Sequence, residues 1–321
     1  MSSRASGAEK VGVLLMAYGG PDSLEDVPAY LNDVRGGRPY SDELLAELTE
    51  RYRAIGGRSP ILGITQAQAK GVARALNSGN TGQQFQAFVG MRHWHPYIRE
   101  VVPDILAGGV DRLVAVVMAP HYSRMSVGAY LQRLDEALNE QAPRRELPVL
   151  AVESWKDQPA FIEAVKRRVI AGLEQFPEAE RDAVMILYTA HSLPQRILEW
   201  GDRYPEELRE SAESIAAAVG HPRWQFAFQS AGATSEPWLG PPIENVLEDL
   251  ASEGVKNVLV CPIGFVCDHV EVLYDVDIEH RGQAEALGMR LERTASLNDD
   301  PLLCQAVATA VRERLTQSQL V

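Results

Sequence analysis

Acidic residues recur at spacings of three or four along the stretch 264–279, as Asp268, Glu271, Asp275 and Glu279. In a helix, at about 100° per residue, all of them would lie within roughly one quadrant of the surface. Like charges at this spacing repel each other by roughly a few tenths of a kcal/mol, and no lysine interrupts them. Apolar residues cover most of the remaining circumference, so we expect a helix buried on most sides. The pattern predicts a carboxylate row facing an internal cleft that can hold a cation; a solvated acidic face is the alternative.

A histidine lies in a second candidate segment, Tyr188-Thr-Ala-His-Ser-Leu-Pro-Gln-Arg196. Ser192 with Gln195 forms a capping-box pattern, and the proline between them suits a first helical turn. His191 is thereby placed between the end of a strand and the start of a helix. Imidazole and carboxylates together suit two tasks, which are binding a first-row divalent metal and exchanging protons with a weakly acidic N–H. Neither an H-E-x-x-H zinc motif nor a G-x-S-x-G elbow occurs, so a zinc or serine hydrolase is not indicated.

Arginines and glycines are concentrated in two runs of the first part of the chain. These are Arg35-Gly-Gly-Arg38 and Arg51-Tyr-Arg-Ala-Ile-Gly-Gly-Arg-Ser-Pro60. Guanidinium groups match carboxylates bidentately, although a mobile, solvated loop has the same composition. Tyr18-Gly19-Gly20 follows an apolar run but lacks the G-x-G-x-x-G spacing, so a dinucleotide site is only weakly suggested.

The elements that must position these residues alternate between apolar runs and segments of helical period. The expected strands are 11–17, 85–90, 113–118, 149–152, 183–188, 226–229 and 258–261. The expected helices include 42–54, 64–76, 157–174, 205–219 and 243–252. This alternation predicts a mainly parallel α/β fold with helices on both sheet faces, and ligands at the carboxyl ends of the strands. The loops expected there contain Tyr18, His93, His121, His191 and the run 264–271.

Similar segments occur in the same order in the first and second parts of the chain, and we call this pattern the internal echo. The segment 88–96 resembles 228–237, the segment 109–120 resembles 254–262, and the strand before Tyr18 resembles the strand before His191. Matches in the same order predict two similar α/β halves, with a boundary near residue 150. We therefore expect one half at 8–150 and the other at 151–321, with the last helix, 301–315, packing on either half.

Length, charge and cysteine content exclude several classes of protein. The chain has 321 residues and a net charge of −13, which argues against nucleic acid as a partner. No apolar stretch is long enough for a membrane span and no signal peptide is recognisable, so a cytoplasmic protein is expected. Cys261, Cys267 and Cys304 form no C-x-x-C pair and are interpreted as buried thiols. Nothing points to an obligate partner, and a monomer is expected.

Taken together, the motifs resemble those of the ferrochelatases over nearly the whole chain. The matching runs are 14–21, 51–60, 119–123, 190–194, 237–241 and 264–275, and they occur in the same order. The resemblance implies two similar Rossmann-like halves with parallel sheets and a porphyrin cleft between them, as in chelatases. It implies that the substrates are Fe²⁺ and coproporphyrin III, that no cofactor is required, and that the product is coproheme for haem b synthesis.

The resemblance also assigns roles to individual residues. His191 and Glu271 would face the metal and the pyrrole nitrogens, while Asp275 and Glu279 extend the acidic line away from them. Tyr18 would approach the iron from the opposite face and be its axial ligand in the product, which favours coproporphyrin III over protoporphyrin IX. The residues that match macrocycle and propionate contacts are Arg35, Arg51, Tyr52, Ser59 and Tyr130. The roles of the neighbouring Arg58 and Arg124 stay open.

The sequence also differs from some ferrochelatases, and other functions are compatible with its motifs. The chain lacks the cysteine-rich extension that binds a [2Fe–2S] cluster in some members and the long hydrophobic lip of membrane-associated ones. A transient contact with the next haem-pathway enzyme is implied by resemblance alone. The alternatives are a protoporphyrin IX ferrochelatase, a tetrapyrrole carrier without catalysis, and a chelatase for a cobalt or sirohaem precursor. The acidic line would be the metal entry path, the proton exit path or an inhibitory metal site.

Overall fold

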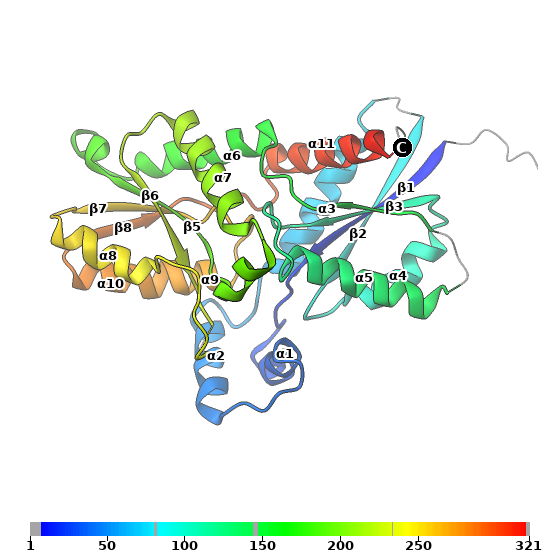
Figure 1. The fold of residues 1–321 in the computed structure, drawn as a ribbon, viewed down its shortest axis with the longest axis horizontal. Helices are drawn as coiled ribbons and strands as arrows, with labels where there is room; N and C mark the ends of the chain where they lie inside the picture. Colours follow the sequence, from blue (N-terminus) through cyan, green and yellow to red (C-terminus); the bar gives the residue numbers. More distant parts are fainter. Residues whose placement is uncertain (1–7, 80–81, 144–146, 233, 319–321) are drawn as a thin grey trace, which may run out of the picture.

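Two parallel four-stranded sheets form the framework of the protein (Figure 1). The computed structural model describes residues 8–79, 82–143, 147–232 and 234–318. The strand order is β2-β1-β3-β4 in the first sheet and β6-β5-β7-β8 in the second, so the same topology occurs twice. The pairings in both sheets are parallel. The predicted fold class, α/β with two similar halves, is confirmed.

The first sheet contains β1 (Glu9–Ala17), β2 (Gln83–Met91), β3 (Arg112–Val117) and β4 (Val149–Val152). The helices of this part are α1 (Val27–Val34), α2 (Asp42–Ala54), α3 (Ile61–Asn77), α4 (Ile98–Ala107) and α5 (Val127–Gln141), with a short 3₁₀ turn, η1 (Leu24–Asp26), before α1. In Figure 1, α1 and α2 project together from the junction of the two sheets.

The second sheet contains β5 (Met185–His191), β6 (Trp224–Gln229), β7 (Asn257–Cys261) and β8 (Arg290–Arg293). The α-helices after β4 are α6 (Pro159–Leu173), α7 (Tyr204–Val219), α8 (Ile243–Ser252), α9 (Val270–Leu273), α10 (Arg281–Ala286) and α11 (Pro301–Gln317). The other helical segments are the 3₁₀ turns η2 (Glu178–Ala183) and η3 (Gln195–Trp200) and the π-helix η4 (Asp275–His280). The segments of the internal echo occupy equivalent places, since β1 and β5 are inner strands and β2 and β6 are edge strands.

Alternation along β1 sends side chains to two different cores. Val11, Val13 and Leu15 are fully buried against α3 and α11, whereas Leu14 and Met16 are fully buried against α4 and α5. A strand covered by helices on both faces has a continuous apolar sequence, which is why this strand is recognisable from the sequence.

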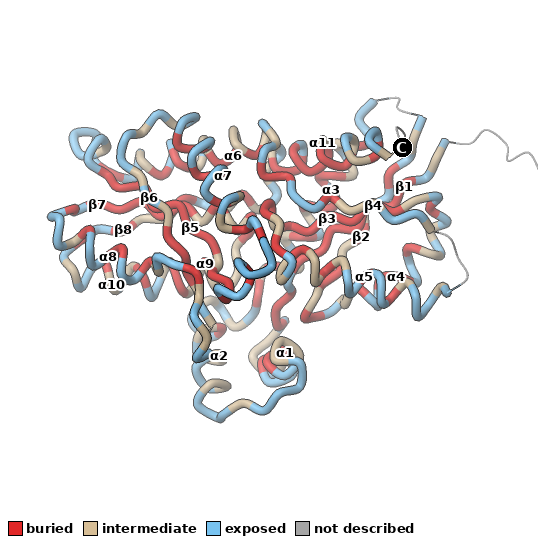
Figure 2. The backbone as a smooth tube through the Cα atoms, viewed as in Figure 1, coloured by how far each residue is buried: buried red, intermediate tan, exposed pale blue. Residues whose placement is uncertain are grey.

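One core runs through both halves. The cluster between α3, α6, α7 and α11 includes residues of both sheets, and Figure 2 shows the buried strands at the centre of each half. Helix α11 packs against α3 and β4 of the first half and also against α6, so it contacts both halves. The predicted boundary at residue 150 falls inside β4, and the chain passes to the second sheet between Val152 and Met185.

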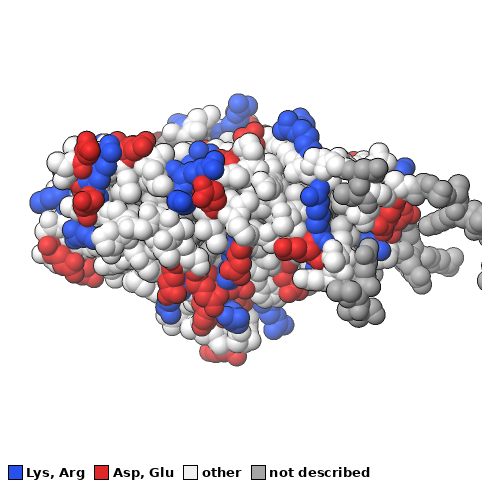
Figure 3. All heavy atoms as spheres, turned by 90° about the horizontal axis from the view of Figure 1, so that it is seen from above, with Lys and Arg blue, Asp and Glu red and all other residues white. Residues whose placement is uncertain are grey.

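The surface carries charges of both signs. On the face shown in Figure 3, Lys and Arg side chains are interspersed with Asp and Glu side chains. Within the described parts of the chain, no helix is long and apolar enough to cross a membrane.

Candidate functional site

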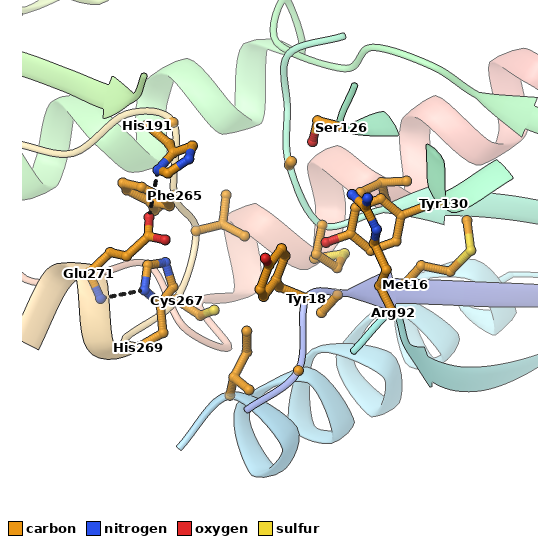
Figure 4. A pocket seen from close by; sticks show the side chains of 18 of the residues that line it. Met16, Tyr18, Arg92, Ser126, Tyr130, His191, Phe265, Cys267, His269 and Glu271 are labelled. Carbon is orange, nitrogen blue, oxygen red and sulfur yellow. Dashed lines mark hydrogen bonds and ion pairs between the residues drawn. The ribbon is translucent and has the colours of Figure 1, made fainter. Parts of the chain in front are cut away.

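Loops at the carboxyl ends of strands from both sheets meet at one cavity of about 300 Å³ (Figure 4). The position agrees with the rule that open α/β sheets bind ligands at this edge. Its lining includes Tyr18 after β1, Arg92 after β2, His191 at the end of β5, and Phe265, His269 and Glu271 after β7. A second pocket of about 630 Å³ adjoins it and shares Tyr18, Tyr52 and Glu271 with the first.

The side chains of His191 and Glu271 face each other in this cavity. The Nδ1 atom of His191 lies 3.1 Å from Oε2 of Glu271, and each side chain is about one-third exposed, at 32% and 31%. The contact has ion-pair distance but not hydrogen-bond direction. The sequence predicted both residues at the reaction centre, and the structure brings them together.

The two groups shift each other's pKa in opposite directions. Burial acts to lower the pKa of His191, but the negative charge and close contact of Glu271 outweigh it and raise that pKa. Burial acts to raise the pKa of Glu271, but the charge of His191 outweighs it and lowers that pKa. The pair therefore favours a carboxylate beside an imidazole that holds a proton more readily than free imidazole does.

His269 supports Glu271 and was missed in the sequence. Its Nδ1 accepts a hydrogen bond from the backbone N–H of Glu271 at 3.1 Å, which caps the first turn of α9. Its ring packs edge-on against Phe265 at 4.6 Å. Burial lowers the pKa of His269, so the neutral imidazole that the cap requires is favoured. Histidine is not among the residues that favour this capping position, so the sequence carries no signal for the cap.

The predicted continuous helix from Asp268 is wrong in detail. Helix α9 begins at Val270 and ends at Leu273, and a π-helix follows from Asp275 to His280. The wider π-turn changes the spacing of the side chains relative to an α-helix. The sequence predicted that the apolar residues of this stretch are buried. Val276 is buried, but Ile278 is 44% exposed.

Asp268 does not belong to the acidic row. Its carboxylate accepts hydrogen bonds from Ser296 and Asn298, and lies 3.7 Å from the guanidinium of Arg293. Its backbone N–H donates to the side chain of Asn298 at 2.9 Å. Arg293 is the last residue of β8, and Ser296 and Asn298 lie in the loop after it, so this part of the chain anchors the segment before α9. Of the four acidic residues expected in the row, Glu271, Asp275 and Glu279 remain.

Arg51 joins the acidic row from the opposite side. Its guanidinium donates to Asp275 at 3.0 Å and lies 3.8 Å from Glu279. The carboxyl of Asp275 also accepts from the Ser230 hydroxyl. Burial, followed by the neighbouring charge of Glu271, raises the pKa of Asp275 to about 6, although Arg51 opposes the shift. Asp275 is therefore poised to exchange protons close to neutral pH.

Tyr18 lies apart from the His191–Glu271 pair in Figure 4 and lines both pockets. Its ring is 4.6 Å from the ring of His93, and that histidine contacts Asp33 at 2.9 Å. Burial, followed by the charge of Glu271, raises the pKa of Tyr18 to about 12. Its phenol is thus neutral in the structure.

Other residues predicted to contact the macrocycle occupy different places. Tyr52, Ser59 and Tyr130 line the cavity, whereas Arg51 lines the adjoining pocket. Arg92, which the sequence analysis did not single out, also lines the cavity, with its guanidinium 5.4 Å from the centre of the Tyr130 ring. It follows β2 directly, so the post-strand rule could have found it.

Three predicted or neighbouring arginines line neither pocket. Arg35 follows α1 and donates to the backbone oxygens of Arg38 and Pro39. Arg58 is exposed. Arg124 is exposed and its guanidinium lies 5.4 Å from the centre of the Trp200 ring. Among the described residues, no group of three His, Cys, Asp or Glu side chains is already arranged to hold a metal ion.

Comparisons with known proteins identify the family. The ferrochelatase family model matches residues 10–315. The chain belongs to the ferrochelatase family. Members of this family insert iron into a porphyrin, so the cavity between the halves is the candidate site of a metal-insertion reaction. The family predicted from the sequence motifs is thereby confirmed.

Individual relatives cover almost the whole ferrochelatase chain. A protein of Herpetosiphon aurantiacus named ferrochelatase is 44% identical over 94% of this chain and 98% of its own. A protein of Geobacillus thermodenitrificans named coproporphyrin III ferrochelatase is 40% identical over 96% of both chains. The solved structure of SirB from Bacillus subtilis with Fe³⁺ has a TM-score of 0.60 at 11% identity and covers 97% of both chains, which shows a shared fold.

Proposed function

We propose that this ferrochelatase inserts Fe²⁺ into coproporphyrin III and so produces coproheme for haem b synthesis. The observation that carries the proposal is one cavity lined by the His191–Glu271 pair and, apart from that pair, by the neutral phenol of Tyr18. A flat macrocycle held between these groups would meet a proton acceptor on one side and an oxygen ligand on the other. The names of several relatives at 37–40% identity support coproporphyrin III as the porphyrin.

Cationic and hydroxyl groups around the cavity suit an acidic porphyrin. Coproporphyrin III carries propionates where protoporphyrin IX carries vinyl groups, so it needs more hydrogen-bond donors and more positive charge at its edge. Tyr52, Ser59 and Tyr130 supply hydroxyl groups, and Arg51 and Arg92 supply guanidinium groups. Contacts to the propionates would provide binding energy remote from the reacting nitrogens, which can be used to distort the macrocycle.

Proton removal is assigned to His191. Each pyrrole N–H must lose its proton as the nitrogen binds iron, and the Fe²⁺ ion must shed water. His191 accepts such a proton with the help of Glu271, whose negative charge stabilises the imidazolium that forms. The pKa of about 6 at Asp275 favours the acidic row as the exit for these protons, since a carboxyl near this pKa both accepts and releases a proton at neutral pH.

An anaerobic assay tests the proposal. Fe²⁺ is mixed with the protein and coproporphyrin III, and the visible spectrum is followed for conversion to the iron porphyrin. We expect catalytic turnover. A stoichiometric spectral shift without turnover would instead support a tetrapyrrole carrier, and turnover confined to protoporphyrin IX would replace the proposed substrate. The Asp249→Asn variant, which changes an exposed carboxylate on α8, provides the control for nonspecific effects of substitution.

A further inference from the structure

A loop of the first half is bound to the second half by carboxylates at the start of α7. Asp202 is 8% exposed. Its Oδ2 atom accepts from the Ser123 hydroxyl at 2.9 Å and from the Arg124 backbone N–H at 2.7 Å. Close by, Oε2 of Glu207 accepts from the Tyr122 backbone N–H at 2.9 Å. Because the loop follows β3 and the carboxylates follow β5, these hydrogen bonds cross the junction between the halves.

The other oxygen of Asp202 is connected to His191 by two hydrogen bonds through Tyr204. Its Oδ1 atom accepts from the backbone N–H of Tyr204 at 3.0 Å, at the first residue of α7. Tyr204 is 7% exposed, lines the cavity, and donates its hydroxyl to the backbone oxygen of His191 at 2.9 Å. On the β6 side the pairing of β5 includes His191, opposite Gln229, whereas on the β7 side the pairing ends at Tyr188 and Cys261. Tyr204 thus holds the backbone from which the imidazole projects.

The Oδ2 atom of Asp202 is connected through Ser123 to the residues before α5 that line the cavity. The Ser123 hydroxyl that it binds also accepts from the backbone N–H of Met125 at 3.2 Å. Met125 lines the cavity, together with Ser126 just before α5 and Tyr130 within it. One buried carboxylate is therefore in contact with the segments that carry both His191 and the porphyrin-facing loop of the first half.

We propose that Asp202 is a positioning residue that sets the distance between these two walls, acting on His191 through Tyr204 and on the opposite loop through Ser123. The inference rests on the proposed function in taking His191 as the acceptor of the pyrrole proton. A displacement of a catalytic group by about 1 Å is enough to lower a rate by about a hundredfold. A bond that fixes the end of β5 relative to the porphyrin-facing loop therefore has a direct effect on turnover.

Three substitutions separate the connection through Tyr204 to His191 from the connection through Ser123 to the porphyrin-facing loop. Tyr204→Phe removes the hydroxyl that binds the His191 carbonyl, so we expect kcat to fall about tenfold with an unchanged dissociation constant for the porphyrin. Ser123→Ala removes the link to the loop, so porphyrin binding weakens while kcat changes little. Asp202→Asn removes the negative charge that strengthens the hydrogen bonds to both oxygens. The amide nitrogen also cannot accept from the donors on its side. Both kcat and porphyrin binding are then impaired.

A double-mutant cycle decides whether Asp202 acts through Tyr204. Residues that act along one path give nonadditive losses, so kcat of the Asp202→Asn/Tyr204→Phe double variant should equal that of the worse single variant to within about twofold. Circular dichroism and thermal melting establish that each variant is folded, and Asp249→Asn is the matched control. Additive losses in the cycle, or a wild-type kcat in Tyr204→Phe, would overturn the proposal.

The substrate assignment does not affect this test. Turnover is measured with whichever porphyrin the wild-type protein metallates, and porphyrin binding is followed separately by fluorescence quenching. Absence of turnover in the wild type contradicts the proposed function. Normal turnover in the wild type with no separation between kcat and binding among the three variants contradicts the positioning role of Asp202.

Discussion

Asp275 is retained in the acidic row at the expense of stability, and its removal should therefore stabilise the protein at high pH. The carboxyl is almost fully buried, with 5% of its side chain exposed. Its pKa lies at about 6 in the folded protein, above its ordinary value of 3.8, because burial and the charge of Glu271 disfavour the ionised form. Asp275→Asn removes this charge and keeps an oxygen that can accept from Arg51 or Ser230.

The magnitude follows from linkage between protonation and folding. Since the folded pKa is above the unfolded value, the group stabilises the protein below the unfolded pKa, and this contribution is lost as the pH rises through about 6. The complete loss is about 3 kcal/mol, and about 1.4 kcal/mol of it falls between pH 5 and pH 8. The asparagine variant has no such dependence. Its stability relative to the wild type should therefore increase by about 1.4 kcal/mol between pH 5 and pH 8.

Urea unfolding of both proteins at pH 5, 6, 7 and 8 measures this difference. Titrating groups that do not interact with Asp275 are common to the two proteins and cancel in the comparison, whereas the pKa of His191, which the charge of Asp275 helps to raise, differs between them. Glu285→Gln is the control, because it removes an exposed carboxyl from the adjacent α10. A difference between Asp275→Asn and the wild type that stays constant from pH 5 to pH 8, or that decreases, would refute the burial argument.

Three further predictions concern the reaction centre. His191→Ala and Glu271→Gln should each lower turnover by about a hundredfold or more while leaving porphyrin binding largely intact; full turnover in both variants would exclude the pair from the mechanism. Glu271→Gln should also move the NMR titration of His191 to lower pH, because the carboxylate is what raises that pKa, and an upward shift would contradict the assignment. Gly264→Ala should destabilise the protein by about 1–3 kcal/mol, because the new Cβ would lie 2.6 Å from Cβ of Ala190; an unchanged melting temperature would show that the strand end adapts.

The sequence predicted those features of the fold that depend on local burial. The inner strands are covered on both faces and have continuous apolar runs, so their positions are close to the predicted ones. Strand β8 was not predicted, because its sequence is Arg-Leu-Glu-Arg and Leu291 is its buried residue. A strand with charged residues at both ends has no signal of this kind.

Site residues that directly follow a strand were predicted from the sequence. Features of the site that depend on contacts between distant residues were missed. His191 and Glu271 come together because β5 and β7 are neighbours, which the alternation of elements already favours. The start of α9 at Val270 depends instead on the His269 cap and on contacts of Asp268 with Ser296 and Asn298, residues distant in the sequence. Helical periodicity carries no information about such partners.

The contacts of the two arginine-rich runs also could not be predicted from the sequence. Arg51 reaches Asp275 in the second half of the chain, a contact that depends on how α2 lies against the π-helix. Arg35, in a run of similar composition, binds backbone oxygens of its own loop. Composition predicts guanidinium groups near the cleft but does not select which of them reaches it.

The central claim is tested most directly by comparing kcat/KM for iron insertion into coproporphyrin III and into protoporphyrin IX under the same anaerobic conditions. Both reactions are followed by the visible spectrum of the product, with Fe²⁺ in excess and the wild-type protein at catalytic concentration. Preference for coproporphyrin III by about tenfold or more, equivalent to about 1.4 kcal/mol of transition-state stabilisation, is the predicted result. Equal efficiencies, or a preference for protoporphyrin IX, would contradict the proposed substrate.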